Sequence, residues 1–266
     1  MESLTAHLLT LSPITLGLLG SLVAGLGTGI GALPMYVAPR LTPRAQDLLL
    51  GLSAGIMLAA TFFSLLLPGL ESVAADSLLS PPLVMFGGIL LGAAGLWFIH
   101  KHVPHEHLIM GHDGPEIQGI QRMWLIVFAI TLHNFPEGLA VGVGFGGPDL
   151  NNAIVLMIGI GLQNMPEGLV VAVALLAAGY SRTKAFLLAL LTGLVEPVGG
   201  LVGVTAVGFA DALLPWGLAV AAGAMLFVIS NEIIPETHRR GNQAPVTFTL
   251  LAGFGLMMVL DQALGA

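Results

Sequence analysis

Two six-residue segments with the same pattern of residue types begin thirty residues apart in the sequence. The first runs from His133 to Gly138 (HNFPEG) and the second from Gln163 to Gly168 (QNMPEG), each within an apolar stretch. An ionisable side chain in the middle of a bilayer costs at least ~2.5 kcal/mol, so the repeated glutamates predict a functional site. Imidazole, amide and carboxylate groups together indicate a site for a divalent metal ion.

Helical spacing brings the polar residues of each segment onto one face. At about 100° per residue, each glutamate projects between the two polar residues that lie four and three positions before it. It can share a metal with either one, which suits two adjacent sites bridged by carboxylates. The arrangement places Glu137 between His133 and Asn134, and Glu167 between Gln163 and Asn164.

Each segment also contains a proline, Pro136 or Pro166. A proline inside a helix removes one hydrogen bond and frees the carbonyl four residues earlier. In lipid such a carbonyl is tolerated only where it is buried in protein or lines a wet cavity. The glycines that follow, Gly138 and Gly168, are expected to add local freedom. Two purely structural kinks would not require Asn and Glu twice at the same offsets.

A third acid, Glu196, stands beside Pro197 in another apolar stretch, and we expect it to face the same cavity. Three buried acids without a buried Lys or Arg need a cation between them. One divalent ion leaves a net charge of −1 on the group and two leave +1, so the number of ions stays open. Because the chain has no cysteine, the ligands are nitrogen and oxygen, which suit Zn²⁺, Fe²⁺, Mn²⁺ and Cd²⁺ better than Cu⁺.

The composition defines the elements that must position these residues. Of the 266 residues, 56% are hydrophobic and 9% are charged, and the mean hydropathy is +0.94, values typical of an integral membrane protein. A spanning helix needs about 20 apolar residues. We therefore expect a single all-α transmembrane domain, residues 1–266, with eight spans at about 12–36, 45–68, 82–101, 122–144, 153–178, 184–208, 213–234 and 245–263.

The basic residues predict the orientation of the chain. All eight fall in alternate loops, at Arg40, Arg44, Lys101, Arg122, Arg182, Lys184, Arg239 and Arg240. By the positive-inside rule these loops are cytoplasmic and both termini lie outside. The longest, 103–120, is then cytoplasmic. The histidines in and beside it either catch metal leaving the protein or chelate it adventitiously: His100, His102, His105, His107 and His112.

Other acids are weaker candidates. Glu232 and Glu236, at the inner end of the seventh span, either line an exit or form ordinary ion pairs with Arg239 and Arg240. Asp47 and Asp261 lie near span ends. For these two we expect a structural role.

The two motifs read in the same chain direction although consecutive spans cross the membrane in opposite directions. The copies are therefore related by inversion, as in many secondary transporters. The competing hypothesis is an intramembrane metal-dependent hydrolase that uses metal-bound water. It is disfavoured because His133 is the only histidine expected near the midplane, whereas catalytic zinc sites usually have two or three nitrogen ligands.

The paired motif, the Glu196 segment, the histidine-bearing loop and the eight-span plan resemble the ZIP family of divalent-metal transporters, and within it the GufA-like bacterial branch. The resemblance implies a 3+2+3 arrangement of spans and a multi-pass homodimer in the cytoplasmic (inner) membrane. It implies transport of divalent metal into the cytoplasm, with zinc the first choice and cadmium, iron and manganese possible. It implies neither an organic cofactor nor a nucleic-acid partner.

The resemblance also implies how the ligands are shared, and that spans 1, 4, 5 and 6 carry metal past a scaffold of the others. Many members have His where this chain has Gln163, and an Asp is known where it has Asn164, so metal preference is expected to depend on these positions. One implied site consists of His133, Glu137, Gln163 and Glu167, and the second of Asn134, Glu137, Asn164, Glu167 and Glu196.

Overall fold

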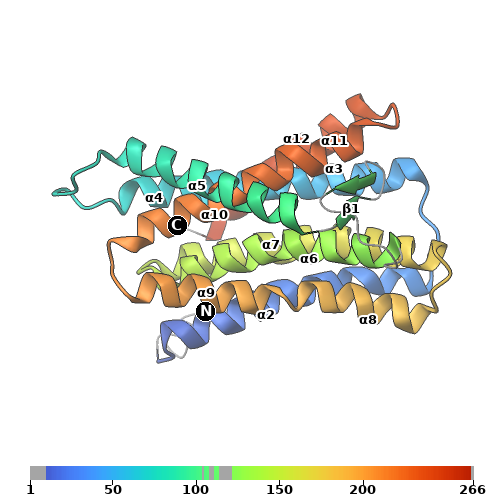
Figure 1. The fold of residues 1–266 in the computed structure, drawn as a ribbon, viewed down its shortest axis with the longest axis horizontal. Helices are drawn as coiled ribbons and strands as arrows, with labels where there is room; N and C mark the ends of the chain where they lie inside the picture. Colours follow the sequence, from blue (N-terminus) through green and yellow to red (C-terminus); the bar gives the residue numbers. More distant parts are fainter. Residues whose placement is uncertain (1–9, 104, 108–110, 114–121, 265–266) are drawn as a thin grey trace.

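The computed structural model describes residues 10–103, 105–107, 111–113 and 122–264, which form a bundle of long helices (Figure 1). A helical segment occupies each of the eight expected ranges. The first three are α2 (Pro13–Ala32) with the short 3-10 helix η1 (Leu33–Tyr36); α3 (Pro43–Ala60), the π-helical η2 (Thr61–Leu66) and α4 (Leu67–Glu71); and α5 (Pro81–His102). Then follow α6 (Arg122–Gly146), α7 (Leu150–Ala177), α8 (Arg182–Gly193) with α9 (Glu196–Gly208), α10 (Leu213–Val228) with the π-helical η3 (Ile229–Ile233) and α11 (Ile234–His238), and α12 (Gln243–Leu264).

The expected boundaries agree with these helices to within about four residues. Among the described residues, seven of the eight segments are long and apolar enough to cross a membrane. The remaining segment, α6, has 25 residues, and at 1.5 Å per residue it too exceeds the ~30 Å of a hydrocarbon core. A short antiparallel pair, β1 (His105–His107) and β2 (Gly111–Asp113), is the described departure from the all-α expectation, and β1 lies against α6.

Side-chain caps begin several of these helices. Ser12 and Thr42 each accept a hydrogen bond from the backbone N–H three residues later, and a proline follows each of them. Ser181 and Asp149 cap α8 and α7 in the same way. A capping oxygen satisfies an otherwise unpaired N–H, and proline tolerates the first helical position because its N–H is not needed there. Local sequence therefore defines where these helices start.

The helix packing has the symmetry expected of an inverted repeat. The four most extensive contacts are α2 with α7, α6 with α9, α3 with α12, and α5 with α10. An inverted repeat would relate span 1 to span 6, span 2 to span 7, span 3 to span 8 and span 4 to span 5. Under this correspondence the α2–α7 contact is equivalent to the α9–α6 contact, and the α3–α12 contact is equivalent to the α10–α5 contact. Figure 1 shows the corresponding division, with α2 and α6 to α9 in one group and α3, α5, α10 and α12 in the other. The paired motif lies in the first group.

The motif glycines permit close backbone contact rather than local freedom. Neither has a positive φ, and both lie inside continuous helices. A Cβ atom added to Gly138 would lie 2.0 Å from the carbonyl oxygen of Glu196, and one added to Gly168 would lie 2.0 Å from that of Thr28. The expectation of added freedom was therefore wrong. These glycines let α6 approach α9, and α7 approach α2, as small residues do in membrane bundles.

Prolines elsewhere alter the helical hydrogen bonding. Span 6 is interrupted at residues 194–195, directly before Glu196 and Pro197, so Glu196 begins α9. The two π-helical segments end directly before Leu67-Pro68 and Ile234-Pro235. Because Pro68 has no N–H to donate, the carbonyl of Ser64 is free to accept a hydrogen bond of 3.0 Å from Asn152 Nδ2 on α7.

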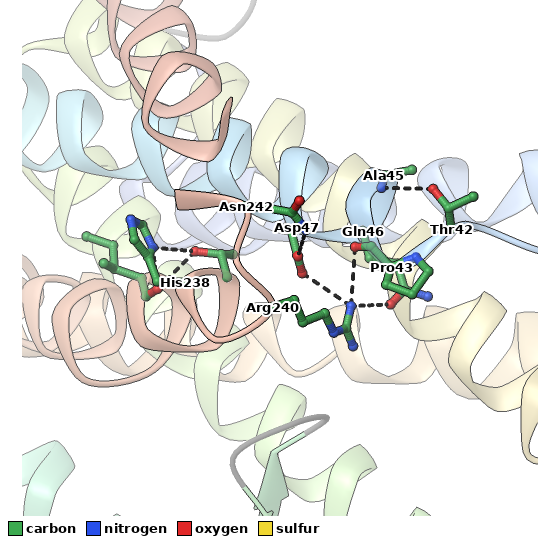
Figure 2. A network of polar contacts seen from close by, with 10 residues as sticks. Thr42, Pro43, Ala45, Gln46, Asp47, His238, Arg240 and Asn242 are labelled. Atoms are coloured by element: carbon green, nitrogen blue, oxygen red, sulfur yellow. Dashed lines mark hydrogen bonds and ion pairs between the residues drawn. The ribbon is translucent and has the colours of Figure 1, made fainter. Parts of the chain in front are cut away.

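A polar network joins the start of α3 to the segment between α11 and α12 (Figure 2). Asp47 is buried, and its carboxylate accepts hydrogen bonds from Arg240 Nη1 at 3.2 Å and from Asn242 Nδ2 at 2.7 Å. The same guanidinium nitrogen donates to the oxygens of Pro43 and Gln46. The expected structural role of Asp47 thus has a clear physical basis, because its partners come from a distant part of the chain.

We expect Asp47→Ala to destabilise the fold by about 2 kcal/mol, the magnitude for losing hydrogen bonds to a buried charged group. Thermal unfolding of the purified protein in detergent would measure the change. Asp76→Ala, which removes an exposed loop acid, is the control and should leave the unfolding temperature unchanged. Equal unfolding temperatures for both variants would contradict a stabilising role for the network.

Candidate metal site

The first motif copy lies in the middle of α6, which continues through Pro136. Asn134 and Glu137 are buried, and His133 is partly buried. Tertiary packing therefore encloses this face of α6, as the motif predicts.

The second copy lies at a corresponding depth in α7, and that helix continues through Pro166. Gln163 and Asn164 are fully buried, and Glu167 is 8% exposed. Glu196, at the start of α9, is also fully buried. Six of the seven predicted ligands thus lie out of solvent, which is costly unless each finds a partner.

A chain of hydrogen bonds links residues of the second copy with Glu196. Asn164 Nδ2 donates to Glu196 Oε1 at 2.6 Å and to the carbonyl oxygen of Ala24 at 3.0 Å. Gln163 Nε2 donates to Asn164 Oδ1 at 2.5 Å. Ser53, on α3, lies 2.8 Å from Gln163 Oε1 and 2.5 Å from Glu167 Oε1. Four predicted ligands and a serine therefore form one connected group.

The three motif carboxylates lie close enough for their charges to interact. Glu137 interacts electrostatically with both Glu167 and Glu196. In the described part of the chain, neither carboxylate oxygen of Glu137 has a hydrogen-bond partner of good geometry, although Gln163 lies beside it. Glu196 Oε2 likewise has no such partner among these residues. We call the following residues the paired-motif site: Asn134, Glu137, Gln163, Asn164, Glu167 and Glu196.

His133 projects toward a second group of residues. Its Nε2 makes a hydrogen bond with Glu232 Oε2, and His100 Nδ1 lies 3.2 Å from Glu232 Oε1. The two imidazole rings stack with centroids 6.3 Å apart. One ligand atom from each of the three residues falls within 4.8 Å of the others, a spacing that fits a metal ion. We call His100, His133 and Glu232 the histidine cluster.

The chain has clear relatives. The family described as ZIP Zinc transporter matches residues 99–261. The zinc transporter GufA of Myxococcus xanthus is 49% identical over 94% of this chain and 99% of its own length. The chain belongs to the ZIP family. Zinc transporter ZIPB of Bordetella bronchiseptica is 46% identical over 93% of this chain and 81% of its own length, and zinc transporter ZupT of Corynebacterium aurimucosum is 35% identical over 90% and 93%.

Membership in the ZIP family confirms the resemblance drawn from the motifs and the expectation of a multi-pass, all-α membrane protein. Of the predicted ligands, the structure brings Glu137, Glu167 and Glu196 within electrostatic reach of one another. His133 interacts electrostatically with Glu167. His133 also makes a hydrogen bond to Glu232, which is not among the partners implied by the resemblance.

The structure adds two details to the sequence interpretation of the histidine cluster. His100 lies in the last turn of α5 and is 3% exposed. Glu232 is buried and contacts histidines, while the nearby Arg240 pairs with Asp47 instead. Another Pro-Glu pair, Pro235-Glu236, begins three residues after Glu232. It was the available sequence indication that this segment belongs with the motif helices.

The proposed metal-catching role of the histidine loop falls largely outside the described residues. His105, His107 and His112 belong to the β1–β2 pair. Residues 104, 108–110 and 114–120 of the loop are not described. That role therefore stays a prediction.

Proposed function

We propose that this ZIP protein transports zinc across the cytoplasmic membrane into the cytoplasm, using the paired-motif site as the transported ion's binding site. The observation that carries the proposal is the convergence of three buried carboxylates from α6, α7 and α9. All eight Lys and Arg residues lie outside these central positions. A divalent cation neutralises such a group, and relatives of similar length are named zinc transporters.

In this proposal, the histidine cluster is a second metal-binding site on the transport path. His133 lies on the same face of α6 as Glu137, one helical turn earlier. It contacts Glu232 on η3 and lies near His100 on α5. Metal leaving the paired-motif site therefore meets two imidazoles and a carboxylate, a donor set that suits Zn²⁺. The positive-inside rule places this end of α5 toward the cytoplasm, so the proposed direction is inward.

The paired-motif site has enough donors for two ions. Glu137 lies between the ligands of both sites implied by the family resemblance, and Glu167 likewise. We propose a binuclear site bridged by these two glutamates, which accepts Cd²⁺, Fe²⁺ and Mn²⁺ as well as Zn²⁺. The six residues of this site offer oxygen donors, and His133, the remaining predicted ligand, is the nitrogen donor beside them. Oxygen donors discriminate weakly among these metals.

The intramembrane hydrolase is not favoured, although one argument against it was wrong. His133 is not an isolated buried histidine, since His100 and Glu232 join it in a set of two imidazoles and one carboxylate. Such a set also occurs in catalytic zinc sites. The transporter is preferred because the relatives are named zinc transporters and the site lies in an inverted repeat.

Zinc uptake into proteoliposomes that contain only the purified protein tests the proposal. We expect saturable uptake that competing Cd²⁺, Fe²⁺ and Mn²⁺ reduce. Metal analysis after equilibration should give at least two ions per chain, because the paired-motif site is proposed to hold two. Tight zinc binding without uptake would overturn the transport function, and one ion per chain would overturn the binuclear site.

Gln163 provides a test of metal preference. Gln163→His adds a nitrogen ligand to the paired-motif site, which favours Zn²⁺ over the oxygen-preferring Mn²⁺. We expect the ratio of zinc to manganese uptake to rise several-fold. Gln243→His, at an exposed position at the start of α12, controls for a new surface histidine. An unchanged ratio in Gln163→His would remove this residue from the proposed ligand set.

We also propose a homodimer in the inner membrane with both termini outside. The mass of the purified protein in detergent would test the homodimer. Labelling, in intact cells, of a cysteine added at either terminus of the protein would test whether that terminus lies outside. The native chain has no cysteine, so labelling would report only the added residue.

A further inference from the structure

Ser53 is a buried polar residue of α3 that no sequence motif includes. It is fully buried, and its hydroxyl lies 2.8 Å from Gln163 Oε1 and 2.5 Å from Glu167 Oε1. A serine or threonine inside a helix commonly donates to the carbonyl of the preceding turn. Ser21 does so to Gly17, and Thr61 to Met57. Both acceptors within hydrogen-bond distance of Ser53, by contrast, lie on α7, and the single O–H of Ser53 is shared between them.

The acceptors around Asn164 determine how the neighbouring amides are oriented. The Ala24 carbonyl is only an acceptor, and so is an ionised Glu196 carboxylate, so Asn164 must present its NH₂ group to them. Its Oδ1 then accepts from Gln163 Nε2. Gln163 Oε1, the atom of this amide that can bind a cation, consequently points at Ser53.

We propose that Ser53 is a positioning residue for the metal site and that the residue at this position tunes metal preference. Its hydroxyl holds the oxygen of Gln163 and one oxygen of Glu167 beside each other. The motif helices α6 and α7 do not complete the site alone, since this contact comes from α3, which packs mainly against α12. This inference rests on the proposed function, because it assumes that Gln163 and Glu167 bind the transported metal.

Serine at this position favours oxygen-only coordination near Gln163 and Glu167. Its oxygen is within hydrogen-bond reach of both ligand atoms, so a sulfur placed there would lie within reach of a metal that those atoms hold. A thiolate is a softer ligand than a hydroxyl. The side chain at position 53 should therefore shift the preference between Zn²⁺ and the softer Cd²⁺.

Calorimetric binding of Zn²⁺ and Cd²⁺ to the purified protein tests the proposal with Ser53→Ala and Ser53→Cys. Ser53→Ala should weaken zinc binding roughly tenfold, as for the loss of one hydrogen bond to a charged group. Ser53→Cys nearly keeps the side-chain volume and should shift the affinity ratio toward Cd²⁺. Ser64→Ala is the matched control: Ser64 is buried in the same span, but it donates to Asp261 on α12, and its loss should not change metal binding.

A double-mutant cycle separates positioning from a general loss of structure. If Ser53 acts through Gln163, Ser53→Ala should have a smaller effect in a Gln163→Ala protein than in the native one. Purely additive effects, or zinc binding and metal preference unchanged in both Ser53 variants, would overturn the proposal. Thermal unfolding of each variant identifies any misfolded protein. If native protein binds zinc but does not transport it, the proposed function fails, whereas normal uptake with unchanged Ser53 variants refutes only the role of Ser53.

Discussion

Zinc uptake should fall by at least a hundredfold in Glu137→Gln, the first of the two largest effects we expect. Glu137 is fully buried and interacts with the charges of Glu167 and Glu196. The substitution keeps the side-chain volume but removes one of three negative charges next to the ion. Two unit charges at 4 Å interact by about 4 kcal/mol at an effective dielectric constant of 20. A loss of that size corresponds to roughly a thousandfold in affinity.

Uptake rates and equilibrium zinc binding should be measured together for this variant. Glu167→Gln is expected to behave in the same way, because Glu167 occupies the corresponding position in the second motif copy. Asn164→Ala, which removes a neutral ligand, should alter only rate or preference. Asp211→Asn, an exposed loop acid, is the control. Native-like uptake by either glutamate variant would contradict the bridging role of that residue.

Much of the fold follows from local features of the sequence. The apolar stretches define the spans, and residues such as Ser12, Thr42 and Ser181 define helix starts because a capping oxygen acts on the N–H only three residues away. The inversion follows from the direction of the two motifs. The motif itself predicts the burial of Asn134 and Glu137, because repetition at identical offsets is visible without a structure.

Other parts of the site depend on contacts that sequence spacing does not report. A single serine in an apolar helix, such as Ser53, has the same local pattern whether it donates a hydrogen bond to its own backbone or to a predicted ligand 110 residues away. His100 ends an apolar span, where most residues meet solvent. Its burial depends on how the end of α5 meets the middle of α6 through Glu232. The π-helical turn that contains Glu232 likewise becomes visible only in the structure.

The second large effect is expected at Glu232, which joins the two imidazoles of the histidine cluster. Glu232→Gln keeps the shape of the side chain but removes the single carboxylate that His100 and His133 share in this cluster. Losing a partner that orients a metal-binding histidine typically costs 10- to 100-fold in affinity or activity. We expect zinc uptake to fall by a similar factor, about 10- to 100-fold.

The transport step that is impaired, zinc binding or zinc release, distinguishes the expected effect of Glu232→Gln from that of Glu137→Gln. Equilibrium zinc binding at the paired-motif site should survive in Glu232→Gln, because its three carboxylates remain, while release into the liposome becomes slow. Zinc binding and uptake measured on the same preparation separate the two steps, and Glu71→Gln, at an exposed position, serves as the control. If zinc binding is lost together with uptake, Glu232 belongs with the paired-motif site, and the path has one metal-binding site instead of two. If neither changes, the contact between His133 and Glu232 is structural, and the histidine cluster is not part of the transport path.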